Sequence, residues 1–360
     1  MDIDKKLTND AIPSTTDNFK TVGVEFSGKF SEFFPIWIVN VLLSIITLGI
    51  YSAWATVRTK SYFYGNTKID GHVFSYLAKP MQILRGRILA IILVVVYSIL
   101  TQYFPILGMI LAILLFILTP WIIVQSLRFN NRMISYRNVR FDFRGSYGDA
   151  FIHFLLLPIV ALLTVYLAMP WVMKKINQYV LSNTTYGETT LVTNIKTAQF
   201  YKTYLLILLA IIGFIGATFA IIAVLGSNVS PQFLASLPAS TMLLVGVFYM
   251  SFFALIRSIA LVQIRNHIFN NSEFIGLASF KSTLEIKGYA ILEITNLLAL
   301  ICSLGIAYPW VAIRSNRYLA KHVQVEINLT AAHAIDTKSE QNSAFGVEAA
   351  EAFDMGVSVI

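Results

Sequence analysis

Three segments of the chain each carry a tryptophan, a cation four residues later and a tyrosine four residues after the cation. A spacing of four places the three side chains on one face of a helix. The cation could bind the phosphate of a lipid headgroup, and three such cations could also form one ligand site. Alternatively, Trp and Tyr anchor the helix at the membrane interface while the cation caps its C-terminus. The nine residues are Trp54, Arg58, Tyr62, Trp171, Lys175, Tyr179, Trp310, Arg314 and Tyr318.

Four polar residues within apolar stretches form a second group of candidates. Arg257 and Glu293 are ionisable, and ionisable residues at membrane depth are costly and often functional. Both could instead lie near a helix end and extend their charged tips to water. Asn40 and Asn296 occupy related places in their segments, where interrupting the helix is a sufficient role.

The sequence does not indicate catalytic chemistry. It contains no phosphate-binding loop of the Gly-x4-Gly-Lys-Ser/Thr type, no dinucleotide-binding glycine pattern and no nucleophile elbow. The histidines have no metal-ligand spacing, and Cys302 has no cysteine partner. We therefore predict no metal, no cofactor and no enzymatic activity. The five histidines are His72, His153, His267, His322 and His333.

The composition is that of a membrane protein. Hydrophobic residues make up 56% of the 360-residue chain and charged residues only 13%, whereas a soluble domain carries about 25% charged residues. Apolar runs of about 20 residues recur, and about 20 helical residues cross the hydrocarbon core of a bilayer. The net charge of +8 favours anionic membrane lipids as partners rather than nucleic acid, because no nucleic-acid-binding motif accompanies it.

Seven apolar segments are of two kinds. Four are typical of spanning helices and form two hairpins with uncharged connections: Ile88–Phe104, Ile106–Leu127, Tyr204–Val224 and Thr241–Ile264. The other three end in the tryptophans of the triplets and are interrupted near their middle: Phe33–Trp54, Phe151–Trp171 and Leu292–Trp310. The interruption leaves only a short apolar stretch in each segment. These segments are therefore re-entrant or interfacial, or else they span the membrane and the repeats are inverted.

An internal repeat underlies this pattern. At a gapless offset of 117 residues, ten identities occur in the 57 positions that begin at Phe26 and Phe143. They include the glycines Gly28 and Gly145 and the paired sequences Asn66–Thr67 and Asn183–Thr184. A truncated third copy shares the triplet. We predict segments with these bounds: a disordered N-terminus, 1–20; membrane repeats, 21–137, 138–275 and 276–329; and a disordered tail, 330–360.

Some loops alternate between polar and apolar residues, as strands do. Residues Tyr62–Lys68 and His72–Tyr76 flank Asp70–Gly71, which is typical of a hairpin with a primed turn. The predicted fold is thus an all-α polytopic membrane protein with internal repeats, two full copies and a truncated third, together with small cytoplasmic β-hairpin elements. Lys and Arg concentrate in the loops between these apolar segments, which the positive-inside rule assigns to the cytoplasm.

Several motifs resemble one known family. The stretch from Phe26 to Asn40, Leu48–Trp54 and Tyr62–Thr67 are similar to the YjgN-like family of bacterial inner membrane proteins, and the similarity runs from about residue 20 to 329. That family is a domain of unknown function, so the resemblance implies a bacterial inner membrane location and no activity.

Two functions follow as hypotheses. The repeats and interrupted segments favour a transporter or channel for a small or amphipathic solute. The basic, aromatic-rich face favours instead a lipid-binding or envelope-associated scaffold without catalytic activity.

Overall fold

The structure is a computed structural model that describes residues 19–225 and 238–331. The terminal segments predicted to be disordered lie largely outside these residues, as does most of the connection 227–240. The prediction of an all-α fold with small hairpins is wrong. Ten short strands close into one antiparallel barrel, in which β1 lies between β10 and β2 and all other neighbours are consecutive along the chain. The strands are β1 (Phe19–Phe26), β2 (Thr67–Ile69), β3 (His72–Tyr76), β4 (Ile134–Tyr136), β5 (Val139–Phe143), β6 (Thr184–Tyr186), β7 (Thr189–Thr193), β8 (Ser272–Phe274), β9 (Ala278–Ser282) and β10 (Val323–Asn328).

The barrel consists of four hairpins and one pair formed by the first and last strands, β1 and β10. In the first hairpin, Asp70 and Gly71 both have positive φ, as a type I′ turn requires. The strand before it begins at Thr67 rather than Tyr62, because α2 continues to Gly65. Strands β1 and β10 pair from Phe19 opposite Asn328 to Gly23 opposite Gln324, and this pairing closes the sheet.

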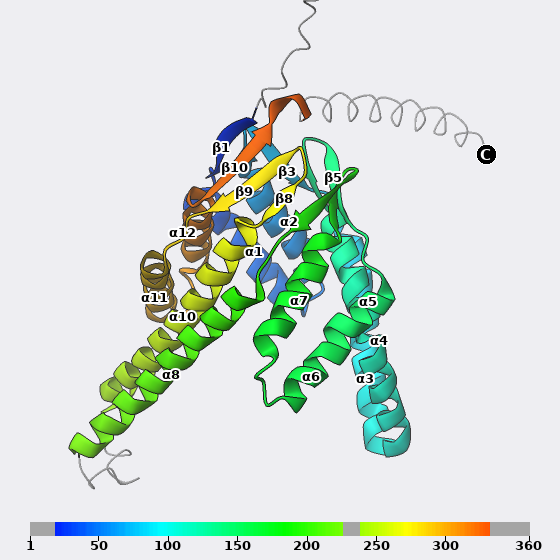
Figure 1. Cartoon of the computed structure of the whole chain (residues 1–360). Coiled ribbons are helices and arrows are strands. Elements are labelled where there is room, and N and C mark those ends of the chain that lie inside the picture. The colour runs from blue at the N-terminus through cyan, green and yellow to red at the C-terminus, as the bar shows by residue number, and fades with distance from the viewer. Residues whose placement is uncertain (1–18, 226–237, 332–360) are drawn as a thin grey trace, which may run out of the picture.

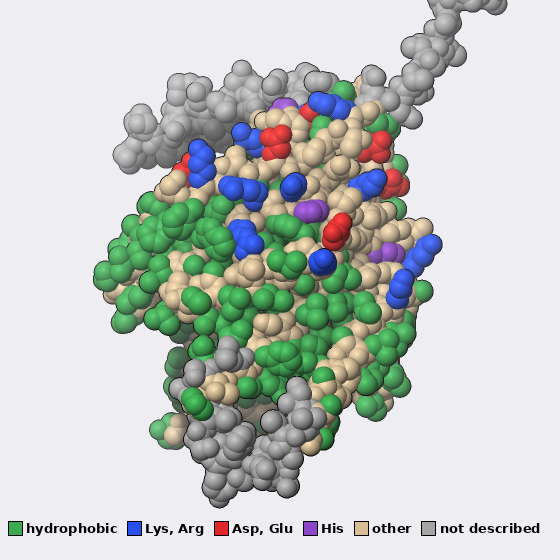
Figure 2. Space-filling model, turned by 90° about the vertical axis from the view of Figure 1, so that its left-hand side faces the viewer, with side chains coloured by type: hydrophobic (Ala, Val, Ile, Leu, Met, Phe, Trp, Pro, Cys, Tyr) green, Lys and Arg blue, Asp and Glu red, His purple; other side chains and the backbone are tan. Residues whose placement is uncertain are grey.

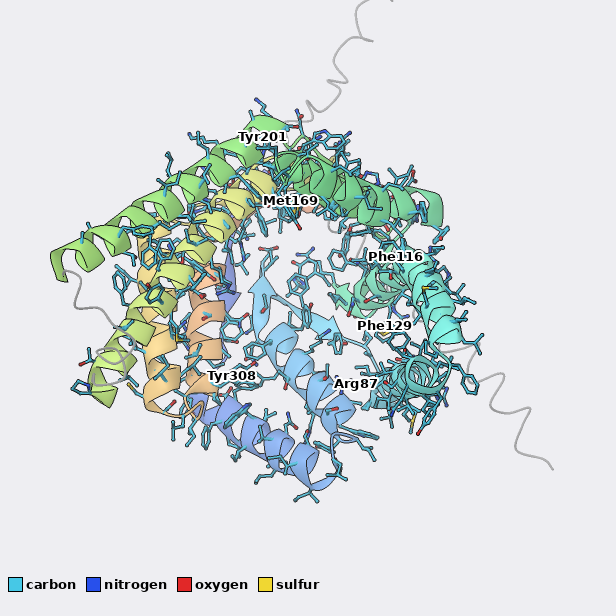
Figure 3. The ribbon with its side chains drawn as sticks, turned by 90° about the horizontal axis from the view of Figure 1, so that it is seen from below. Arg87, Phe116, Phe129, Met169, Tyr201 and Tyr308 are labelled. Carbon is cyan, nitrogen blue, oxygen red and sulfur yellow. The ribbon has the colours of Figure 1, made fainter. Side chains whose placement is uncertain are left out.

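Helical segments connect each hairpin to the next, and all of them leave the same end of the barrel (Figure 1). Seen from below, they surround the barrel axis (Figure 3). Neighbouring pairs touch around the ring, and α1 contacts α12 to complete it. The segments are α1 (Phe30–Ile46), α2 (Ser52–Gly65), α3 (Pro80–Tyr103), α4 (Pro105–Arg132), α5 (Tyr147–Phe151), η1 (Ile152–Leu156), α6 (Leu157–Leu163), α7 (Met169–Ser182), α8 (Thr197–Leu225), α10 (Ala239–Phe269), α11 (Ile286–Cys302) and α12 (Tyr308–Lys321).

Two of the helix pairs are long and apolar. Helices α3, α4, α8 and α10 contain four stretches long and apolar enough to cross a membrane: Pro80–Tyr103, Pro105–Arg132, Thr197–Ala220 and Val245–Phe269. At most 17% of their most apolar windows is buried inside the protein. These surfaces therefore need an apolar environment that the chain itself does not supply.

The three segments that end in tryptophan form short pairs that double back. The chain reverses at Leu48–Gly49, at Val165–Tyr166 and at Leu304–Gly305, where all six residues have positive φ. The turns expose apolar side chains, with Leu48 95% and Leu304 92% accessible. Helix α1 has 17 residues, which corresponds to roughly 26 Å, whereas the 28 residues of α4 extend roughly 42 Å. Each short pair thus enters and leaves at the barrel end.

Part of the core lies inside the barrel, and part lies among the helices near it. One cluster contains Tyr186, Leu191, Phe274 and Leu277, and another consists of Val323, Val325 and Ile327 of β10. In β10 these apolar residues are buried and alternate with exposed polar ones, which is the period of two expected for a strand with one buried face.

A charged cluster stabilises the turns at the far end of the barrel. Asp70 accepts hydrogen bonds from Lys20 at 2.8 Å and from Arg137 at 3.0 Å. The Arg137 side chain is only 4% exposed, so this carboxylate stabilises a charge that has little contact with water. The hydrogen bond from Lys20 holds the pKa of Asp70 below its ordinary value.

We predict that Asp70→Asn destabilises the barrel at pH 7 by about 1.5–3 kcal/mol, because it removes the acceptor of charged hydrogen bonds. The folded-state pKa of Asp70 is depressed, so its contribution is complete above the ordinary aspartate pKa. It is lost as the pH falls through the folded-state pKa. Thermal unfolding in detergent across that pH range measures both effects. Asp142→Asn, which breaks the more exposed pair with Arg132, is the control, and an equal loss in both variants would contradict the prediction.

Candidate anion-binding groove between helices α1 and α12

The three triplets lie on α2, α7 and α12, the second helix of each short pair. In the first two pairs, the tyrosine hydroxyl forms a hydrogen bond to the residue just before the first helix. The Tyr62 hydroxyl accepts a hydrogen bond from the backbone N–H of Lys29 at 2.8 Å, and the Tyr179 hydroxyl donates one to the Ser146 carbonyl at 2.9 Å. Burial raises the pKa of Tyr179 to about 12, so this hydroxyl keeps the proton that it donates.

Glycine allows these tyrosines to approach closely. A Cβ added to Gly145 would lie 2.4 Å from the Tyr179 hydroxyl and 2.5 Å from the Phe143 ring. At Gly288 a Cβ would lie 2.4 Å from the Tyr318 hydroxyl. Close packing against a tyrosine and a phenylalanine therefore explains why both repeats have glycine at this position, Gly28 and Gly145.

The cations of the triplets have different surroundings. Arg58 donates to the Tyr51 hydroxyl at 2.8 Å, and Lys175 lies partly exposed on α7. Arg314 donates to Thr295 Oγ1 at 2.7 Å and to Asn296 Oδ1 at 2.9 Å, with its guanidinium 5.0 Å from the centre of the Trp310 ring.

The structure pairs the polar residues of the apolar segments. Asn40 reaches from α1 to the Ala55 carbonyl of α2 at 3.4 Å, and Asn296 reaches from α11 to Ser315 of α12 at 2.9 Å. Both are buried and join the two helices of a short pair. Arg257 of α10 forms an ion pair with Glu293 of α11. Each of the four residues thus has a partner on a neighbouring helix.

The third triplet forms part of a groove of about 590 Å³, which we call the α1–α12 groove. Four cations line it, and the side chains of Trp310, Tyr318, Phe30 and Ile291 supply aromatic and apolar walls. Arg58 and Lys175 do not line this groove, so it is not a site of three triplet cations. The four cations are Lys29, Arg314, Arg317 and Lys321.

Contacts between the two ends of the chain hold the groove together. Arg317 donates a hydrogen bond to the Gly28 carbonyl at 2.8 Å, and the rings of Trp37 and Tyr308 lie 6.1 Å apart. These contacts join α1 to α12 beneath the paired strands β1 and β10. The groove thus depends on barrel closure.

The charge balance of the groove favours an anion. Helix α12 contains no acidic residue, and its cations lie toward its C-terminus, where the helix dipole stabilises positive charge. Lys29 has Glu32 at 3.7 Å, and both side chains are well exposed. On the face shown in Figure 2, charged side chains of both signs, with Lys and Arg prominent, gather near the barrel, above a broad hydrophobic surface. Such an arrangement can bind a phosphate beside an apolar chain.

The sequence indicated part of this site. Arg314 was a candidate, and Arg317 and Lys321 lie three and seven residues beyond it, so helical spacing could have added them. Lys29 had no local signal, because only the pairing of β1 with β10 brings it to α12. In residues 19–225 and 238–331, no group of three or more His, Cys, Asp or Glu side chains could hold a metal ion.

Comparisons with known proteins agree with a membrane location. Residues 21–352 match a family described as "Bacterial protein of unknown function (DUF898)". The "Inner membrane protein YjgN" of Salmonella typhimurium is 32% identical over 157 residues, which are 43% of this chain and 40% of that protein. The protein of the same name from Escherichia coli K12 is 35% identical over 127 residues, 34% of this chain and 31% of its own length. The chain thus aligns with less than half the length of these relatives, and no solved structure matches it.

We predict that Gly145→Ala destabilises the protein by about 1–3 kcal/mol, because the added methyl group overpacks the contact with Tyr179. Gly148→Ala is the matched control. It lies on α5 with no neighbouring atom within 4 Å of the new Cβ, and alanine favours a helix over glycine by up to about 1 kcal/mol. Thermal unfolding of both variants in one detergent gives the comparison. Equal stability of the two variants would rule out the close approach of Tyr179.

Proposed function

The chain belongs to the DUF898 family of bacterial proteins of unknown function, and from that premise we propose that this inner membrane protein binds anionic lipid headgroups in the α1–α12 groove. One observation carries the proposal. Four cations converge beside exposed aromatic and apolar side chains: three lie on α12, a helix without acidic residues, and Lys29 lies at the start of α1. An anionic phospholipid matches this combination, because its phosphate headgroup adjoins its acyl chains.

The surface of the helices supports a placement in the bilayer. The two long pairs provide the spans, and the short pairs insert only their apolar tips, Leu48, Val165 and Leu304. From tip to barrel, each second helix carries Trp, then a cation, then Tyr, which is the order of an aromatic belt beside headgroups. In this proposal the groove lies at headgroup depth, and the three short pairs are copies of one repeated module.

The size of the cavity at the far end of the barrel favours binding over transport. This cavity holds about 160 Å³ between apolar side chains and Arg137, less than the roughly 300–1,000 Å³ typical of a ligand site. A solute that crossed the barrel along its axis would have to pass this narrow cavity. The repeats suggested transport as a function. Because of this narrow cavity, we favour lipid binding over transport.

We predict that Lys29→Gln with Lys321→Gln weakens binding of phosphatidylglycerol. Each surface cation contributes about 1 kcal/mol toward anionic lipid, so the double variant loses about 25-fold in affinity. Native mass spectrometry with added phosphatidylglycerol or phosphatidylcholine measures it. Arg140→Gln with Lys281→Gln removes the same charge from the barrel strands and serves as control. If both double variants lose the same amount, binding follows net charge and the groove is not the site.

We also predict that the barrel faces the cytoplasm. In a Cys302→Ser background, a cysteine at Tyr103, the last residue of α3, reacts with an impermeant thiol reagent added to intact cells. A cysteine at Glu188, in the turn between β6 and β7, reacts only after the membrane is opened. Both positions are exposed. The reverse pattern would place the barrel in the periplasm.

A further inference from the structure

A second cavity lies where the barrel meets the helices. It holds about 330 Å³, and we call it the barrel cavity. Its walls come from strands at both ends of the chain and from the last turns of α10 and α12. The residues that line it are Val24, Phe26, Thr67, Ile69, Phe74, Arg265, Phe269, Phe280, Asn316, Leu319, Ala320, Val323 and Val325.

Arg265 is the one charged residue in this lining. Its Nε is buried and has no hydrogen-bond partner among the described residues, and its guanidinium lies 4.8 Å from the centre of the Phe269 ring. The two ionisable neighbours on α11 do not neutralise it, since Tyr289 is an uncharged phenol at neutral pH and Glu293 is paired with Arg257. Arg265 is partly buried, and a cation that loses water without gaining a counter-charge is costly. The cavity therefore offers an anion an electrostatic partner.

The rest of the barrel interior is apolar. The barrel cavity shares Ile69, Phe74, Phe280 and Val325 with the smaller cavity at the far end. There Arg137 is already paired with Asp70 at 3.0 Å. The two cavities adjoin along the barrel axis, where a strand of five residues extends roughly 17 Å. An unbranched acyl chain fits the shape and polarity of this space.

The helix side provides an approach to Arg265. A cavity of about 450 Å³ on α10 is lined by Arg257, Leu261 and Ile264 and extends to Arg265 and Phe269. Asn316, on the opposite wall of the barrel cavity, is exposed. Arg265 thus lies between the apolar barrel interior and the space bounded by the helices. A head group can reach it from the helix side while the tail points into the barrel.

We propose that the barrel cavity binds a single-chain anionic amphiphile, with its acyl tail against Phe74, Phe280 and Val325 and its anionic head on Arg265. A fatty acid carboxylate and a lysophospholipid phosphate share this chemistry. The site is separate from the α1–α12 groove and does not depend on lipid binding there. A small soluble anion would leave the apolar walls uncovered, and an uncharged lipid would leave Arg265 unpaired.

The test uses photolabelling in nanodiscs of zwitterionic lipid. Dodecanoic acid carrying a diazirine at the end of its chain is compared with dodecyl phosphate and with dodecanol that carry the same group. With wild-type protein, both anions label peptides of β9 and β10. Arg265→Gln reduces this labelling by the anions about tenfold or more, because it removes a charged hydrogen-bond donor, and leaves labelling by dodecanol unchanged. The stronger of the two anions identifies the head group.

Further variants keep the result interpretable. Val325→Phe fills the cavity and abolishes labelling by all three probes, and thermal unfolding confirms that each variant is folded. Lys29→Gln with Lys321→Gln leaves labelling unchanged, so a failure of the groove and a failure of this site are distinguishable. Label confined to α3, α4, α8 and α10, or equal labelling of wild type and Arg265→Gln, would overturn the proposal. Labelling that is seen only after deletion of residues 1–18 or 332–360 would also overturn the proposal, because a segment of the chain itself would then occupy the cavity.

Discussion

The pairing of β1 with β10 is the interaction on which the rest of the structure depends. It joins Phe19 to Asn328 and Gly23 to Gln324, so nearly the whole described chain lies between the two strands. Without it, the other strands would form an open sheet of short hairpins with two unprotected edges. The same pairing brings α1 beside α12, and thereby places Lys29 opposite Arg314 and Arg317. The groove therefore forms when the barrel closes.

Closure also dictates where the helices go. A hairpin of a closed antiparallel barrel begins and ends at the same rim, so every helical connection must leave and return there. The short pairs meet this requirement by reversing at apolar turns with positive φ, and the long pairs by crossing and returning. Buried amides inside the short pairs, Asn40 and Asn296, satisfy backbone or side-chain groups of the partner helix. In the first and third short pairs, a polar residue that interrupts the apolar stretch therefore forms a contact between the two helices.

The sequence predicted the parts of this fold that have local signals. Long apolar runs predicted α3, α4, α8 and α10, and spacing of four predicted the shared helix face of each triplet. The barrel could not be predicted, because its strands have three to eight residues and pair across intervening helices. A three-residue strand such as Ile134–Tyr136 has too few residues to show alternation. Arg265 was missed for a related reason: it directly follows the predicted span Thr241–Ile264, and strands distant in the sequence enclose it together with α12.

The two sets of cations differ in how strongly they require a ligand. The groove cations keep access to water, and Arg317 already donates to a carbonyl, so an empty groove costs little free energy. Arg265 has lost much of its hydration, and no carboxylate of the described chain compensates it. Stability alone would favour an apolar residue at this position, since replacement of a buried charge by a well-packed apolar side chain is often neutral or stabilising. A positive charge held there at such a cost is explained by an anion that enters the barrel.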